Sequence, residues 1–146
     1  MIGAPWFSPK KILQEIRRED CPGCTVEPAE FTPRAIPGKS TQPRYKDQPC
    51  HGIRFRVIEP GKARPFRTVT AVIAAIHKHH AAELEWLPFF DTLAGGPWLR
   101  EQLQAGMGAE EIAVKTRPQL DAFDAERPKQ YLTWQAMLET GRTVPE

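Results

Sequence analysis

Cysteines and long apolar runs are both scarce in this sequence. It holds three cysteines among 146 residues, an odd number that argues against a disulfide framework and suits a reducing compartment. No run of about 18 apolar residues occurs, so we expect no contact with a membrane through a spanning helix. The first residues lack the basic and then apolar pattern of an export signal. We therefore expect a cytoplasmic protein if the chain is complete; if it is a piece of a longer protein, its location stays unknown.

The overall charge is also small, at a formal net value of +2, but it is unevenly distributed. Residues 1–67 hold 13 Lys and Arg against 7 Asp and Glu, whereas the remainder holds 7 against 11. A basic half is compatible with an anionic ligand, such as a carboxylated glycan or nucleic acid, and also with an ordinary solvated surface. Because no recognition-helix signature accompanies the basic half, nucleic-acid binding is the weakest of these interpretations.

The periodicity of apolar residues predicts an α+β fold, with several helices packed on a small mixed sheet in a single domain. Strands are expected at residues 25–31 and 51–60, and Pro28 assigns the first of them to an edge or a bulge. Residues 1–7 are either a short strand or a docking segment, and the run after Gln130 is either a last strand or a tail. The expected helices cover residues 8–19, 64–80, 96–106, 108–116 and 117–134.

The long helix at 64–80 carries an apolar stripe made of Val69, Val72, Ile73 and Ile76. It ends in His77, Lys78, His79 and His80. His77 and His80 share one face, where imidazolium groups interact favourably with the helix dipole, and His80 continues the stripe. We therefore interpret these histidines as a helix end at the edge of the core rather than as a ligand set.

A proline- and glycine-rich loop separates the two predicted strands. Residues 32–49 show no periodicity, and irregular stretches of this length are often functional. Within it, Gly38-Lys39-Ser40 matches the end of a phosphate-binding loop. The match fails because Pro33 stands where that loop needs glycine, Pro37 removes an amide donor, and Pro43 prevents a helix from following. We therefore predict no nucleotide binding.

Cys21-Pro-Gly-Cys24 is the one Cys-x-x-Cys pair in the chain. A redox pair of this type opens a helix after a strand, whereas this one follows a predicted helix. A zinc site would need two further ligands, and neither Cys50-His51 nor the histidines of the long helix form a second pair at ligand spacing. We predict a simple turn here, with no metal and no cofactor.

No arrangement of side chains predicts catalysis by this chain. The Gly-x-Ser-x-Gly pattern of nucleophilic serines is missing. Glu27 and Glu30 flank the loop and are the better carboxylate candidates, but no pair stands out as an acid with its base or nucleophile. The predicted catalytic set is therefore empty.

Five segments nevertheless resemble one known family, in the same order and with similar spacing. They are IGAPW at 2–6, EFTPRAIPGKSTQPRYKDQPCHGIRFRV at 30–57, ARPFRTVTAVIAAI at 63–76, FDTLAGGPWLREQLQAG at 90–106 and AEEIAVKTRPQLDAFDAERPKQYL at 109–132. Together they resemble the C-terminal domain of the bacterial exo-β-N-acetylmuramidases, long catalogued as a domain of unknown function. Departures from the family pattern are Val69 in place of a usual glycine, a missing Thr-Asp after the second strand, and the extra cysteines of the turn.

The resemblance implies a role in the recycling of cell-wall peptidoglycan. Members of that family remove N-acetylmuramic acid from the non-reducing ends of peptidoglycan fragments, in a cleft between a Rossmann-like N-terminal domain and this one. The catalytic carboxylate is attributed to the N-terminal domain, which residues 1–146 do not include. We therefore expect one half of a substrate cleft, inactive alone, whose partners are muramic acid-containing fragments and a Rossmann-like domain in the same chain or a separate one.

The resemblance also places the substrate-binding site in the loop. The family's loop motifs match Phe31 to Pro33, Ile36 to Ser40, Pro43 to Tyr45 and Cys50 to Gly52. Muramic acid carries a lactyl carboxylate, which basic side chains can pair with, and sugar hydroxyls bind hydroxyl groups and aromatic faces. The predicted site residues are Arg34, Lys39, Ser40, Arg44, Tyr45, Lys46 and His51.

Two alternatives remain open at this point. The loop can instead be a proline-stiffened cover over the sheet edge, with its charges in solvent. The whole chain can be a free-standing module that binds cell-wall sugar or a partner protein. The extent of the gene distinguishes these, because an adjoining Rossmann-like coding region favours the two-part enzyme.

Overall fold

The structure is a computed structural model that describes residues 1–126. Two compact units are present, residues 1–113 and the segment that begins at Val114, and each is considered by itself. The expected strand or tail after Gln130 lies outside the described residues. The elements are β1 (Ile2–Ala4), α1 (Pro9–Glu15), a 3-10 helix (Arg18–Asp20), β2 (Cys24–Phe31), β3 (Cys50–Val57), α2 (Pro65–His80), α3 (Pro88–Ala94), α4 (Trp98–Gln104) and α5 (Ala109–Glu126). The α+β class is thereby confirmed.

The sheet has three strands in the order β1-β3-β2, and both pairings are antiparallel. Pro28 lies in β2, which is an edge strand as expected. The prediction of a mixed sheet is wrong for the described residues. Parallel neighbours need a crossover connection that returns the chain to the same end of the sheet. The loop after β2 instead leads directly into its neighbour β3, so that pair runs antiparallel.

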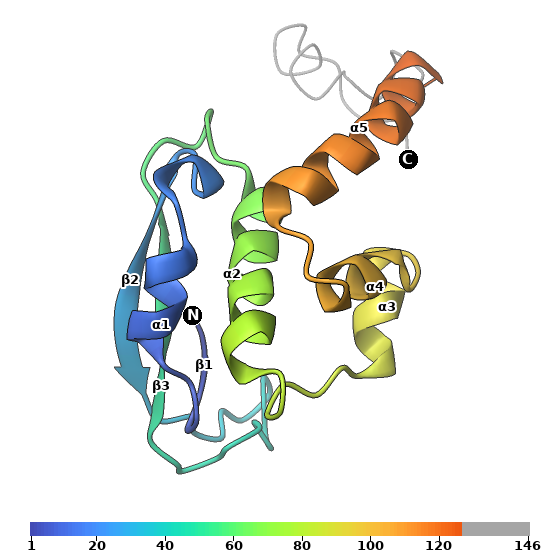
Figure 1. Ribbon diagram of the computed structural model, residues 1–146. Coiled ribbons are helices and arrows are strands. Elements are labelled where there is room, and N and C mark those ends of the chain that lie inside the picture. The colour runs from blue at the N-terminus through green and yellow to red at the C-terminus, as the bar shows by residue number, and fades with distance from the viewer. Residues whose placement is uncertain (127–146) are drawn as a thin grey trace, which may run out of the picture. The chain divides into compact units, whose positions relative to one another are not determined.

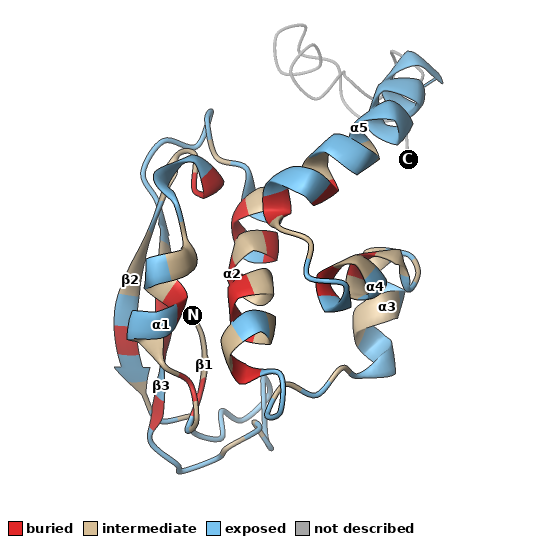
Figure 2. Cartoon of the chain, viewed as in Figure 1, coloured by how far each residue is buried: buried red, intermediate tan, exposed pale blue. Residues whose placement is uncertain are grey.

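Helices α1 and α2 cover one face of the sheet (Figure 1). The core between them is built on Ile12 from α1, Ile53 from β3, and Val72 and Ile76 from α2. Figure 2 shows buried segments, in red, on α1, on the strands and along α2. A second cluster, centred on Leu99, Leu103 and Ile112, packs partly against Ile73 on another side of α2. Helix α2 therefore contributes to both cores.

The apolar stripe predicted on α2 is only partly right. Val72 and Ile76 are buried, but Val69 is 42% exposed, and Thr68 and Thr70 are buried instead. The Thr68 hydroxyl donates a hydrogen bond to the Asp20 carbonyl oxygen at 3.1 Å. This bond satisfies the polar group, which is why a threonine can occupy a core position.

Three helix predictions need correction. The helix expected at 8–19 ends at Glu15, and a separate 3-10 helix follows at Arg18–Asp20. Helix α3 lies where a mixed connection was expected; Pro88 begins it, and Gly95 ends it with a left-handed φ of 74°. Within the described residues, the helices predicted for 108–116 and 117–134 form one helix, α5, with Pro118 inside it, and the predicted stretch 127–134 lies outside those residues. A proline removes one helical hydrogen bond and normally marks a break, but good helix formers surround Pro118 on both sides. Within residues 1–126, no helix combines the length and apolar character needed to cross a membrane.

Candidate functional site

The middle of the proline-rich loop forms a tight turn. The Ile36 amide donates to the Ser40 carbonyl oxygen at 2.8 Å, and the amides of Lys39 and Ser40 both donate to the Ile36 carbonyl oxygen. Gly38 has a φ of 74°, which glycine adopts without strain. A phosphate-binding loop keeps such amides free for the anion. Here they are used inside the turn, and residues 41–49 contain no helix.

The end of the loop is held in an unusual backbone conformation. Tyr45 and Asp47 have φ values of 57° and 59°, which costs roughly 1–2 kcal/mol for each non-glycine residue. The Asp47 amide donates to the Pro33 carbonyl oxygen at 2.8 Å, and the Gln48 amide donates to that of Tyr45 at 3.0 Å. These bonds tie the two ends of the loop together and fix the direction in which Tyr45 points.

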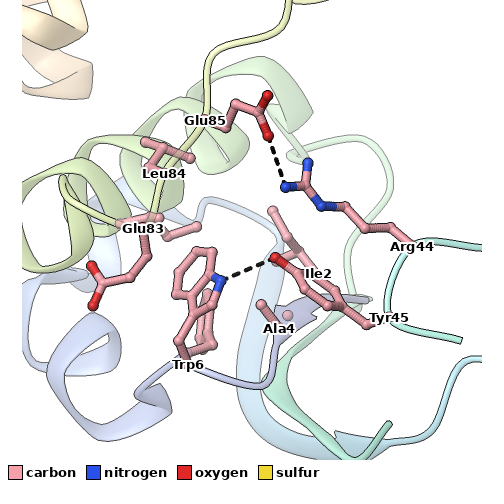
Figure 3. A pocket seen from close by; sticks show the side chains of 11 residues that line it. Ile2, Ala4, Trp6, Arg44, Tyr45, Glu83, Leu84 and Glu85 are labelled. Carbon is pink, nitrogen blue, oxygen red and sulfur yellow. Dashed lines mark hydrogen bonds and ion pairs between the residues drawn. The ribbon is translucent and has the colours of Figure 1, made fainter. Parts of the chain in front are cut away.

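Tyr45, on the loop, contacts Trp6, which lies in the segment after β1. The Trp6 Nε1 donates to the Tyr45 hydroxyl at 3.1 Å (Figure 3). The Arg44 guanidinium lies 5.4 Å from the centre of the Tyr45 ring. Its Nη2 donates to Glu85 Oε2 at 2.8 Å, and this hydrogen bond raises the pKa of Arg44. Arg44 is therefore already paired with a carboxylate.

These side chains border a cavity of about 320 Å³. It lies where β1, the residues after β1, the loop and the segment after α2 meet (Figure 3). Its apolar part is formed by Ile2, Ala4, Phe7, Ile76 and Leu84, and its other lining residues are Gly3, Trp6, Arg44, Tyr45, Glu83 and Glu85. Arg44 and Glu85, which are hydrogen-bonded although 41 positions apart in the sequence, therefore border the same cavity.

The structure brings only two of the predicted site residues to this cavity, namely Arg44 and Tyr45. The others on the loop are exposed and do not line it: Arg34, Lys39, Ser40 and Lys46. His51 lies on β3, where its Nδ1 is 3.3 Å from Glu30 Oε1 on the neighbouring strand. The sequence reasoning missed Trp6 and Glu85 as parts of the site. Trp6 stood within the family-like segment at 2–6, whereas Glu83 and Glu85 gave no signal beyond an ordinary surface.

The two carboxylates that flank the loop are both engaged. Glu27 is paired with Arg56, and this hydrogen bond lowers the pKa of Glu27. A general acid needs the opposite, a carboxyl group that stays protonated near neutral pH. Glu30 is paired with His51 on the exposed strand edge. Neither geometry favours acid catalysis.

His79 and His80, at the end of α2, contact Glu15 and Ser8 in the N-terminal part of the chain. His80 is buried, and its Nε2 accepts a hydrogen bond from the Ser8 amide at 3.3 Å. Burial lowers the pKa of His80, which keeps the ring neutral and able to accept. His79 lies 2.9 Å from Glu15 on α1. The interpretation of His80 as a residue at the edge of the core is confirmed.

The cysteines are free thiols in a turn and at a strand end. Cys21 and Cys50 are buried, and burial raises the pKa of both thiols, which disfavours the reactive thiolate. Within residues 1–126, no group of three or more His, Cys, Asp or Glu side chains is arranged to hold a metal ion.

Comparison with known protein families assigns this chain to one of them. The protein-family model described as "Exo-beta-N-acetylmuramidase NamZ, C-terminal" matches residues 1–133. The chain belongs to this family. The resemblance inferred from the five sequence segments is thereby confirmed.

This chain is similar to one curated protein and, in fold, to one solved structure, and both are longer than it. The peptidoglycan β-N-acetylmuramidase NamZ of Bacillus subtilis (strain 168) is 29% identical over 136 residues, which are 92% of this chain and 31% of that protein. A crystal structure of a DUF1343 family protein from Bacteroides fragilis matches 84% of this chain and 32% of its own, with a TM-score of 0.62 and 17% identity. That structure supports the fold. The chain spans about a third of the length of each of these two proteins.

Proposed function

We propose that this chain is the auxiliary half of an exo-β-N-acetylmuramidase and forms one wall of a cleft for peptidoglycan fragments. The B. subtilis relative is described as acting on peptidoglycan, and two thirds of that protein have no counterpart here. In the proposal, a separate catalytic domain, in the same chain or another, supplies the reacting carboxylate. The residues of this chain bind and orient the sugar.

The observation that carries the proposal is the set of unpaired cations on an ordered loop. Arg34, Lys39 and Lys46 are exposed, and none has a carboxylate partner within the described residues. Arg44, by contrast, is paired with Glu85. Because the ends of the loop are tied together, the backbone has little conformational freedom left to lose when these side chains bind an anion, and the remaining cost is the ordering of the side chains themselves. The lactyl carboxylate of N-acetylmuramic acid is an anion of suitable size and charge.

A titration of the ¹⁵N-labelled chain with N-acetylmuramic acid tests this proposal. We expect amide shifts to cluster in residues 31–52. Lys39→Ala should weaken binding about fivefold, because an exposed ion pair contributes up to about 1 kcal/mol. Lys62→Ala is the matched control, since Lys62 is an exposed lysine outside the loop that pairs with Glu59. An absence of shifts, or equal losses in the two variants, would refute the loop as the binding surface.

We also expect no hydrolysis by this chain alone. Glu27 is paired with Arg56, and Glu30 is an exposed residue beside His51, so neither is placed in the enclosed, apolar setting that favours a protonated general acid. A chromogenic β-N-acetylmuramide should remain intact with the wild-type chain and with Glu27→Gln or Glu30→Gln. Turnover by the wild type that disappears in either variant would show that the chain is catalytic.

A further inference from the structure

The cavity beside Trp6 and Tyr45 is lined by apolar side chains, two carboxylates and one cation, whereas the loop next to it carries several exposed cations. We propose that this cavity is a subsite for one neutral N-acetylated sugar ring, and that the anionic muramyl residue binds outside it. The proposal rests on the function proposed above, because it assumes a glycan ligand. It adds where the neutral ring binds and why the charged ring does not.

The size and lining of the cavity fit a single ring. Its volume of about 320 Å³ is at the lower end of the range for small-molecule sites, roughly 300–1,000 Å³. The apolar lining residues Ile2, Ala4 and Leu84 are drawn around the Trp6 indole and the Tyr45 phenol (Figure 3). Pyranose rings present C–H groups on their faces, and an N-acetyl group adds a methyl. Such surfaces pack well against aromatic side chains that keep one polar atom at the edge.

The rim offers both a donor and an acceptor. The Arg44–Glu85 pair uses one guanidinium nitrogen and one carboxylate oxygen, so other N–H groups and the second oxygen remain for a ligand. A sugar hydroxyl both donates and accepts a hydrogen bond, and an N-acetyl group offers a carbonyl oxygen and an N–H. The ion pair can therefore bind a neutral ring at two atoms without losing its own contact.

The charge at the cavity disfavours an anion. Glu83 and Glu85 contribute two negative charges and Arg44 one positive charge. Arg44 is neutralised by Glu85, and Glu83 has no ion-pair partner among residues 1–126. In Figure 3 the Glu83 carboxylate lies beyond the indole of Trp6, away from Tyr45. A lactyl carboxylate in the cavity would be repelled, whereas Lys39 and its neighbouring cations attract it.

Separate titrations with N-acetylglucosamine and N-acetylmuramic acid test the assignment. With N-acetylglucosamine, we expect the Trp6 indole N–H and the amides of Tyr45 and Leu84 to shift. N-acetylmuramic acid should shift the loop amides near Lys39 and leave the indole signal unchanged up to about fivefold higher concentration. If N-acetylmuramic acid shifts the Trp6 indole at the lower concentration, or if N-acetylglucosamine does not shift it, the proposal is wrong.

Two pairs of variants sharpen the test. Trp6→Phe keeps an aromatic face and should retain N-acetylglucosamine binding, whereas Trp6→Leu should weaken it about tenfold; circular dichroism confirms that both fold. Glu85→Gln frees the charge of Arg44 and should bring N-acetylmuramic acid into the cavity, with a shift of the indole signal. Equal binding by the two Trp6 variants, or no change in Glu85→Gln, would contradict the proposal.

Failure of this proposal is distinguishable from failure of the proposed function. Lys39→Ala should weaken N-acetylmuramic acid and leave N-acetylglucosamine binding unchanged, because Lys39 does not line the cavity. If N-acetylmuramic acid binds at the loop but neither sugar shifts the Trp6 signal, only the subsite proposal is refuted. If neither sugar binds at all, both the subsite proposal and the proposed function are refuted.

Discussion

Replacement of Gly52 by alanine is expected to destabilise the sheet by about 3 kcal/mol or more. Gly52 in β3 is directly opposite Gly3 in β1. A Cβ atom added at Gly52 would lie 2.9 Å from the Gly3 Cα and closer still to the Ile2 carbonyl oxygen. Both obstacles are backbone atoms, so the clash cannot be relieved by a side-chain rotation. The two strands would have to separate, and β1 also forms one wall of the cavity.

Urea unfolding of the variant measures this loss. Gly61→Ala is the control, because Gly61 has open space around its Cβ position, and a change within about 0.5 kcal/mol is expected there. Gly3→Ala should resemble Gly52→Ala, since its added Cβ would lie 2.7 Å from the Gly52 Cα. A Gly52→Ala protein as stable as the Gly61→Ala control would show that the strands are not paired this closely.

Replacement of Asp20 by alanine is expected to cost about 2 kcal/mol, because it removes a buried carboxylate that accepts three hydrogen bonds from the half-exposed Arg17. Asp20 is 4% exposed. Its carboxylate accepts hydrogen bonds from the Arg17 backbone amide at 3.1 Å and from the Arg17 guanidinium at 3.1 and 3.2 Å. Arg67 on α2 approaches the same carboxylate at 3.7 Å. The contact therefore joins the 3-10 helix to α2.

The same carboxylate makes stability depend on pH. Burial alone would raise the pKa of Asp20, but the hydrogen bonds from Arg17 oppose it and the net pKa is lowered. A lowered folded-state pKa means that the contribution is present above the ordinary value of about 4 and is lost as the pH falls through the folded value. Asp20→Asn should flatten this loss in urea unfolding between about pH 2 and 5. Asp121→Asn, an exposed control, should retain it; equal profiles would contradict the role of Asp20.

Local sequence signals predicted the elements that have strong periodicity and clear ends. Ser8 and Pro9 begin α1 as expected, and Pro65 begins α2. The three-residue spacing placed His77 and His80 correctly at the end of α2. Where a local signal was weak or conflicted with its surroundings, the prediction failed: α3 is only seven residues long, and Pro118 does not end α5.

The candidate site was predicted only on its loop side. The loop stood out because its composition and the family motifs are contiguous in the chain. Trp6 and Tyr45 are 39 residues apart, and Arg44 and Glu85 are 41 apart. No periodic pattern links positions at these separations. The sequence therefore predicted Arg44 as a free cation for the ligand, whereas in the structure Glu85 neutralises it.

The sequence by itself determined the α+β class, the family-like motifs and the extent of the proline-rich loop, because each depends on residues close together in the chain. The tertiary structure decided the antiparallel order of the strands, the second buried side of α2, and which cations of the loop are paired. Those features depend on which distant segments come into contact. Charge compensation and cavity shape are set by these long-range contacts, so they followed only from the folded chain.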